Sequence, residues 1–169
     1  MEAMQRSKTL PIHNRNFWLL LCSICVLVMF TTIFKDEWLT SREPNLLFYV
    51  IVPTLTILSG VLGMFAISLF FRQAVPFLDF LAISLIVNTI MQLAENILKL
   101  VYYLLWEYPG ILYIFLVIPG GFILMTAGLK RWTKLDLWLA LLLTTVDFII
   151  GLAVGIFLTE FISITTPGS

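Results

Sequence analysis

Long hydrophobic stretches, separated by short polar segments, make up most of this chain. Five of them are close to or beyond the length of about 20 residues that an α-helix needs to cross a bilayer. They cover residues 17–34, 45–71, 77–103, 110–129 and 137–161. Because the connections are short, neighbouring spans are expected to pack antiparallel. The pattern therefore predicts an all-α fold, an integral membrane bundle of five transmembrane helices.

The composition supports a membrane location for the whole chain. Hydrophobic residues make up 60% of it and charged residues 12%, whereas soluble domains average about 45–50% and about 25%. No segment outside the hydrophobic stretches is long enough to fold alone, so residues 1–169 are expected to form a single polytopic domain. The bilayer is then its first partner. The net charge of zero gives no basic surface for nucleic acid, which is not expected as a partner.

Basic residues gather on one side of the predicted spans. Seven of them precede the first span or lie in the second and fourth connections: Arg6, Lys8, Arg15, Arg72, Lys130, Arg131 and Lys134. The opposite side has only Lys35 and Arg42. The positive-inside rule then predicts a cytoplasmic N-terminus and an exoplasmic C-terminus. No small-x-small cleavage site follows the first span, which is expected to remain as a signal anchor. The plasma (cytoplasmic) membrane is the expected location, and an endomembrane is the alternative.

The third span carries a polar stripe. Four side chains recur at intervals of four, three and four residues: Asn88, Gln92, Glu95 and Lys99. At about 100° per residue they fall within about 60° of one another on a helix. Glu95 and Lys99 have the spacing and order of a helical ion pair. Ionisable groups inside a membrane are costly and indicate a functional site, here a ligand or ion path. The alternative is polar packing between helices or subunits.

Two further features fall at a similar depth. Asp147 lies about ten residues, or about 15 Å, inside the fifth span. The fourth span is interrupted in mid-membrane by three helix-breaking residues: Pro119, Gly120 and Gly121. Transporters use such breaks to hold ions or substrates, although a simple kink is the alternative reading. The shared depth predicts a polar site near the centre of the bilayer.

Small residues predict close helix contacts. Gly151 and Gly155 are four residues apart on the fifth span, and Ser59 and Gly63 have the same spacing on the second. Such pairs let helix backbones approach closely. The sequence therefore predicts that the second and fifth spans each pack tightly against another helix.

Few residues suit catalysis or cofactor binding. The one histidine, His13, lies in the polar N-terminal segment, and the two cysteines, Cys22 and Cys25, lie inside the first span. Metal and haem sites need clusters of such ligands, so neither a metal nor another cofactor is expected. The chain is predicted not to be an enzyme. A proton-shuttling role for Glu95 and Lys99 within a larger enzyme complex, and a redox role for the cysteines, stay open.

These features favour a non-catalytic subunit or assembly partner of a larger membrane protein complex. Short loops, small-residue faces and the polar stripe all suit contact with other membrane subunits or with a second copy of the chain. The alternative is a small oligomeric transporter or channel, with an ion or solute path near the third and fifth spans. A membrane-embedded binder of a lipid or small molecule is a third hypothesis.

Overall fold

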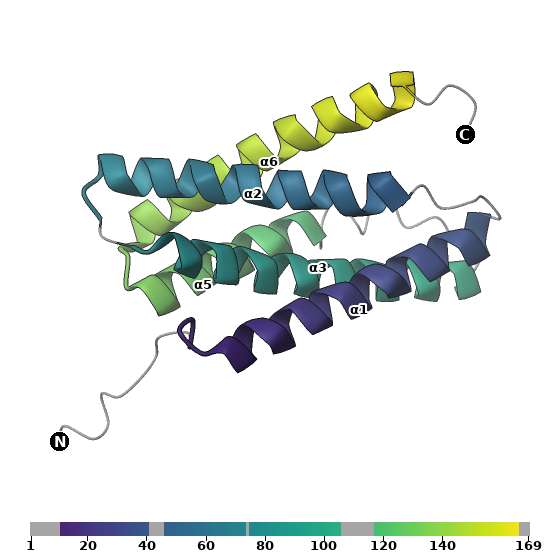
Figure 1. Ribbon diagram of the computed structural model, residues 1–169, viewed down its shortest axis with the longest axis horizontal. Coiled ribbons are helices and arrows are strands. Elements are labelled where there is room, and N and C mark those ends of the chain that lie inside the picture. Colours follow the sequence, from purple (N-terminus) through teal and green to yellow (C-terminus); the bar gives the residue numbers. More distant parts are fainter. Residues whose placement is uncertain (1–10, 41–45, 74, 106–116, 166–169) are drawn as a thin grey trace.

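The computed structural model describes residues 11–40, 46–73, 75–105 and 117–165, and within these ranges the chain forms five helices (Figure 1). They are α1 (Arg15–Thr40), α2 (Leu46–Phe70), α3 (Phe77–Leu105), α5 (Ile118–Thr133) and α6 (Leu137–Thr165). The predicted all-α fold is confirmed. Four helices, α1, α2, α3 and α6, are long and apolar enough to cross a membrane.

The fourth predicted span is described only in part. α5 has 16 residues and begins at Ile118, so residues 110–116 of the predicted span lie outside the described residues. The second, third and fifth predicted segments agree with helices α2, α3 and α6 to within four residues, whereas α1 continues six residues beyond the predicted end at residue 34.

Four helices form a ring, and the fifth lies beside it. α2 contacts α6 and α3, while α5 contacts α3 and α6. α1 packs on α3 from outside the ring (Figure 1). The α2–α6 pair makes the most extensive contact. α5 is much shorter than α3 and α6, which have 29 residues each. Among the described residues, all four ring helices are therefore present together only at the end of the bundle where α5 lies.

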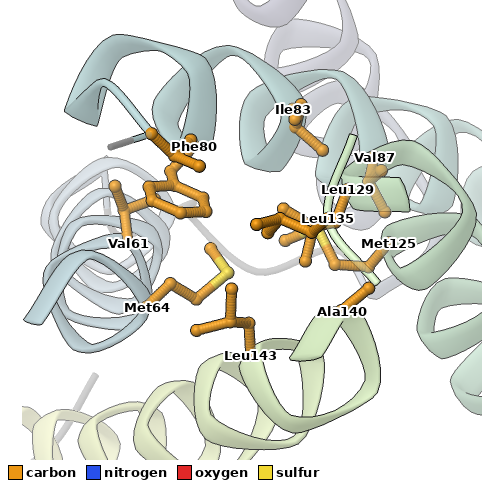
Figure 2. Packing of buried hydrophobic residues seen from close by; sticks show 11 residues of the cluster. Val61, Met64, Phe80, Ile83, Val87, Met125, Leu129, Leu135, Ala140 and Leu143 are labelled. Atoms are coloured by element: carbon orange, nitrogen blue, oxygen red, sulfur yellow. The ribbon is translucent and has the colours of Figure 1, made fainter. Parts of the chain in front are cut away.

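The buried core lies at that same end, which we call the inner half. Figure 2 shows side chains from all four ring helices meeting there, and Phe80, Met64 and Leu143 are fully buried. In a bilayer such a core stabilises the bundle by dispersion contacts, because lipid tails are as apolar as leucine. The inner half contains the helix ends that join α2 to α3 and α5 to α6 (Figure 1).

Local signals explain where the helices end at this side. Arg72 and Lys134 adopt left-handed backbone conformations, with φ of 55° and 58°. The amide of Gln73 donates to the carbonyl of Ser68 at 2.9 Å, which closes the last turn of α2. A left-handed residue after the last turn is a common way to end a helix, and a basic side chain there interacts favourably with the helix dipole.

Candidate functional site

The α2–α6 contact places Asp147 against the backbone of α2. A Cβ atom added to Gly60 would overlap the Oδ1 atom of Asp147 and lie 3.1 Å from its Cγ atom. A Cβ atom on Gly63 would overlap the Cδ1 atom of Ile150. At Gly60 the added atom would also lie 3.3 Å from the backbone oxygen of Asp147, so glycine allows α6 to approach α2 this closely there, whereas at Gly63 the overlap is with the terminal methyl group of the flexible Ile150 side chain.

The sequence reasoning missed Gly60 and named Ser59 beside it. The hydroxyl of Ser59 donates to the carbonyl of Thr56 on its own helix, at 2.9 Å. The pair Gly60 and Gly63, three residues apart, was a signal that could have found the contact, because small residues at helical spacing mark close-packed faces.

Gly151 and Gly155 have a different role from the two glycines of α2. A Cβ atom on Gly151 would lie 3.4 Å from the Cγ2 atom of Thr56, and one on Gly155 would lie 3.6 Å from its Oγ1 atom. Both are ordinary van der Waals distances, so the α2–α6 contact does not require glycine at these positions. Their small size instead leaves room beside α6.

That room belongs to an open cleft of about 610 Å³, which we call the Asp147 cleft. Its lining comes from one face of α6, with contributions from α2 and α3. The lining residues are Thr56, Ile57, Asn88, Asp147, Phe148, Gly151, Leu152, Gly155, Ile156, Thr159 and Glu160. The α6 residues lie beyond the inner core, on the part of the helix that diverges from the bundle toward the C-terminus (Figure 1).

Two smaller cavities adjoin the Asp147 cleft. One, of about 270 Å³, lies between α1, α2 and α3 and includes Gln92 and Cys25. The other, of about 170 Å³, lies between α3, α5 and α6 and includes Gly121. Asn88 lines all three spaces, and Asp147 lines two. These two side chains therefore mark the point where the cavities meet.

Asp147, Asn88 and Gly60 share one depth. Asn88 is eleven residues from the inner end of α3, and Asp147 and Gly60 are each ten residues from the inner ends of their helices. At about 1.5 Å per residue, all three lie about 15 Å along the bundle. The depth expected from the sequence for Asn88 and Asp147 thus corresponds to real proximity at the cleft.

Polar groups at the cleft have unused hydrogen-bonding capacity. Among the described residues, Asp147 makes no hydrogen bond and no ion pair, and its side chain is half-buried. The hydroxyl of Thr56 is buried without a partner. Asn88 is exposed and donates its amide hydrogen to the carbonyl of Ser84, at 2.9 Å. Unsatisfied polar groups in a low-dielectric environment are costly, so this cluster favours a polar or charged occupant.

The remainder of the polar stripe lies away from the Asp147 cleft. Gln92 lines only the 270 Å³ cavity among these three spaces. The ammonium of Lys99 pairs with the carboxylate of Glu95 at 2.5 Å, and the two side chains are 40% and 25% exposed. The residues of the predicted stripe therefore lie in three different places. Asn88 lines the Asp147 cleft, Gln92 lines the 270 Å³ cavity, and Glu95 and Lys99 form an ion pair nearer the far end of α3.

Polar contacts attach α1 to α3. The amide of Asn96 donates to the hydroxyl of Thr32 at 2.8 Å, and the Cys25 thiol lies 3.1 Å from the Thr89 hydroxyl. Both cysteines are free, and Cys22 is exposed. These contacts account for Asn96 and Cys25 as structural groups between two helices.

The Pro119-Gly120-Gly121 segment forms the first turn of α5. Val117, before this turn, is also in a right-handed helical conformation, and the residues that precede it lie outside the described ranges. Cβ atoms on Gly120 and Gly121 would meet the Met91 side chain at 3.8 and 3.4 Å, again ordinary contacts. Gly121 lines the 170 Å³ cavity together with Asn88 and Asp147. The start of α5 thus borders the polar site.

Within the part of the chain that the structure describes, no group of three or more histidine, cysteine, aspartate or glutamate side chains could hold a metal ion. No known protein-family model matches the chain, and neither curated proteins nor solved structures show a significant match to it.

Proposed function

We propose that this chain is a non-catalytic integral membrane subunit, and that a transmembrane helix of another subunit covers its Asp147 cleft. The observation that carries the proposal is the polar cluster at about 15 Å depth, where Asn88 is exposed and Asp147 has no partner among the described residues. A charged aspartate facing hydrocarbon at the centre of a bilayer costs about 3 kcal/mol on insertion scales. A polar partner helix would remove that cost.

The proposed topology has five spans, a cytoplasmic N-terminus and an exoplasmic C-terminus, in the plasma membrane. Exposed basic side chains at the inner half support this orientation: Arg72, Lys130, Arg131 and Lys134. With that orientation the closed core lies in the cytoplasmic leaflet. The Asp147 cleft then opens from the bilayer centre into the outer leaflet.

The proposed partner is a different protein rather than a second copy of the chain. A parallel copy would bring a second Asp147 to the same depth. Lys99 is eleven residues beyond Asn88 on α3, about 16 Å farther out, and it pairs with Glu95. A second copy therefore offers Asp147 no basic group at the required depth among the described residues.

A solute path is the second candidate, supported by the three cavities that share Asn88. The position of the Glu95–Lys99 pair argues against it, because neither residue lines any of these cavities.

Native mass spectrometry of the protein, extracted gently from its own membrane, tests the subunit proposal. We expect a stoichiometric foreign membrane subunit. Leu152→Trp, which fills the cleft, should release that subunit, while Phe157→Trp should retain it because Phe157 lies on α6 outside the cleft lining. A monomer or homo-oligomer in the wild-type preparation would contradict the proposal and favour solute-flux assays in liposomes.

A further inference from the structure

We infer that the helix covering the Asp147 cleft carries a lysine or arginine at the depth of Asp147, and that this basic side chain pairs with the Asp147 carboxylate. The inference rests on the proposed function, since it names the chemistry of the partner at the same site.

The charge of the cleft points to a basic partner group. Among the cleft's lining residues, Asp147 is the acidic group without a partner in the described part of the chain, because Glu160 already makes a contact of its own. No lysine, arginine or histidine lines the cleft. Farther along the cleft, facing Gly151 and Gly155, the Thr56 hydroxyl is buried without a hydrogen-bond partner. The Asn88 amide nitrogen donates to the carbonyl and hydroxyl oxygens of Ser84, and the Asn88 side-chain oxygen is an acceptor. A lysine ammonium has three donors and an arginine guanidinium has five, so either could bond to the Asp147 carboxylate and the Asn88 carbonyl oxygen together.

The shape of the cleft favours a helix over a small cation. The α6 lining extends from Asp147 to Glu160, which is about 20 Å at 1.5 Å per residue. It includes Gly151 and Gly155, and added Cβ atoms there would meet only ordinary contacts from α2. The contact with α2 therefore does not require glycine at either position. Gly151 is buried against α2 and Gly155 is half-buried at the cleft. A small residue such as Gly155 beside the cleft allows a second helix backbone to approach closely.

Burial explains why the pairing should be strong enough to select a partner. Asp147 is already half-buried between α2 and α6, so a covering helix completes its removal from lipid. An ion pair formed there replaces an isolated charge, which is the state with the greatest cost. The Glu95–Lys99 pair lies elsewhere and is satisfied within one helix.

Designed helices provide a defined test. Three leucine- and alanine-based helices of about 22 residues are needed: one with a central lysine, one with leucine at that position, and one with the lysine moved two turns outward. The full chain and each helix would be reconstituted in phosphatidylcholine–phosphatidylglycerol vesicles, and association measured by fluorescence energy transfer. We expect about tenfold tighter association of the central-lysine helix than of the leucine helix, equivalent to about 1.4 kcal/mol.

Matched variants of the chain assign the preference to Asp147. Asp147→Asn should reduce the central-lysine helix to the level of the leucine helix, whereas Glu160→Gln should leave the tenfold preference intact. Gly155→Leu should weaken association of every helix by obstructing the cleft. Circular dichroism and thermal unfolding of each variant would establish that it is folded before its association is compared.

Two results would overturn the inference. The first is equal association of the central-lysine and leucine helices with the folded wild-type chain. The second is a lysine preference that survives in Asp147→Asn. If either occurs while the native protein retains a foreign subunit, the subunit proposal stands and only the charge pairing fails. Asp147-dependent binding of dodecylamine without binding of any helix would identify a cationic amphiphile as the occupant, and would also overturn the inference.

Discussion

The two halves of this bundle differ in how completely the described helices enclose one another, because α5 is described only beside the inner half. In the inner half α2, α3, α5 and α6 surround a core in which Phe80 and Met64 are 0% exposed. Farther along the same helices, α6 lines an open cleft of about 610 Å³. The inner half thus satisfies its own packing, while the outer half leaves an acidic, glycine-containing face uncovered among the described residues.

The glycines express the same difference residue by residue. Gly60 and Gly63 face α6 most closely: an added Cβ atom on Gly60 would overlap Asp147, and one on Gly63 would force the end of the Ile150 side chain to move. Gly151 and Gly155 are not needed by the contact between α2 and α6. We therefore assign Gly60 and Gly63 to the packing of α2 on α6, and we attribute Gly151 and Gly155 to contact with a partner.

Removing a large side chain should give the largest difference in stability loss between the inner half and the outer half. Phe80→Ala should lower the free energy of unfolding by about 3 kcal/mol, because it leaves a cavity among the four helices. Phe148→Ala, at a side chain 43% exposed beside the cleft, should cost less than about 1 kcal/mol. Reversible unfolding in mixed micelles would measure both. Equal losses would mean that the inner half is no better packed than the outer.

The glycines give the next largest effect. Gly60→Ala should destabilise the chain by about 2 kcal/mol, since the added methyl group must displace Asp147 or the helix itself. Gly151→Ala should change the stability of the isolated chain by less than about 0.5 kcal/mol, while weakening partner association. The same unfolding assay serves for both variants. A larger loss for Gly151→Ala than for Gly60→Ala would reverse the assignment of the two glycine pairs.

The attachment of α1 should respond more weakly. Asn96→Leu removes the bond to Thr32 and should cost about 1 kcal/mol, within the range measured for hydrogen bonds between membrane helices. Looser packing of α1 on α3 should speed the reaction of Cys25 with a maleimide. Cys22 is exposed already, so its rate provides the internal control and should stay constant. An unchanged Cys25 rate would show that Asn96 does not hold the two helices together.

The smallest effect belongs to the ion pair outside the cleft. Glu95→Gln should change the free energy of unfolding by less than about 0.5 kcal/mol, because the pair with Lys99 lies within one helix and is partly exposed. It should also leave partner association unchanged, as measured by co-purification. Loss of the partner in Glu95→Gln would extend the interface beyond the Asp147 cleft.

Much of the fold follows from the hydrophobic pattern, because the length and spacing of apolar stretches determine where membrane helices begin and end. The position of Asp147 at the depth of Asn88 also followed, since residue count converts directly into distance along a helix. The hydrophobic pattern did not show which helix or cleft each face of a helix would meet. Periodicity identifies a polar stripe on α3 without revealing that Asn96 faces α1 while Asn88 lines the cleft.

Gly60 is a second example of a contact that the sequence did not predict. Its importance depends on the Asp147 side chain of another helix, and a single sequence does not specify which two helices meet. The expectation that the second and fifth spans pack closely left their partners open, and the structure pairs them with each other.

Site-specific photo-crosslinking in native membranes would test most directly whether a partner covers the cleft. A photoreactive residue at position 152, which lines the cleft, should crosslink to a membrane helix of another protein. The same residue at position 157 should crosslink to lipid, since it lies outside the cleft lining and points about 140° away around α6. The side chains of Leu152 and Phe157 are 54% and 66% exposed, so access is comparable. Lipid adducts at both positions, or a crosslink from position 152 to the chain itself, would contradict the proposed partner.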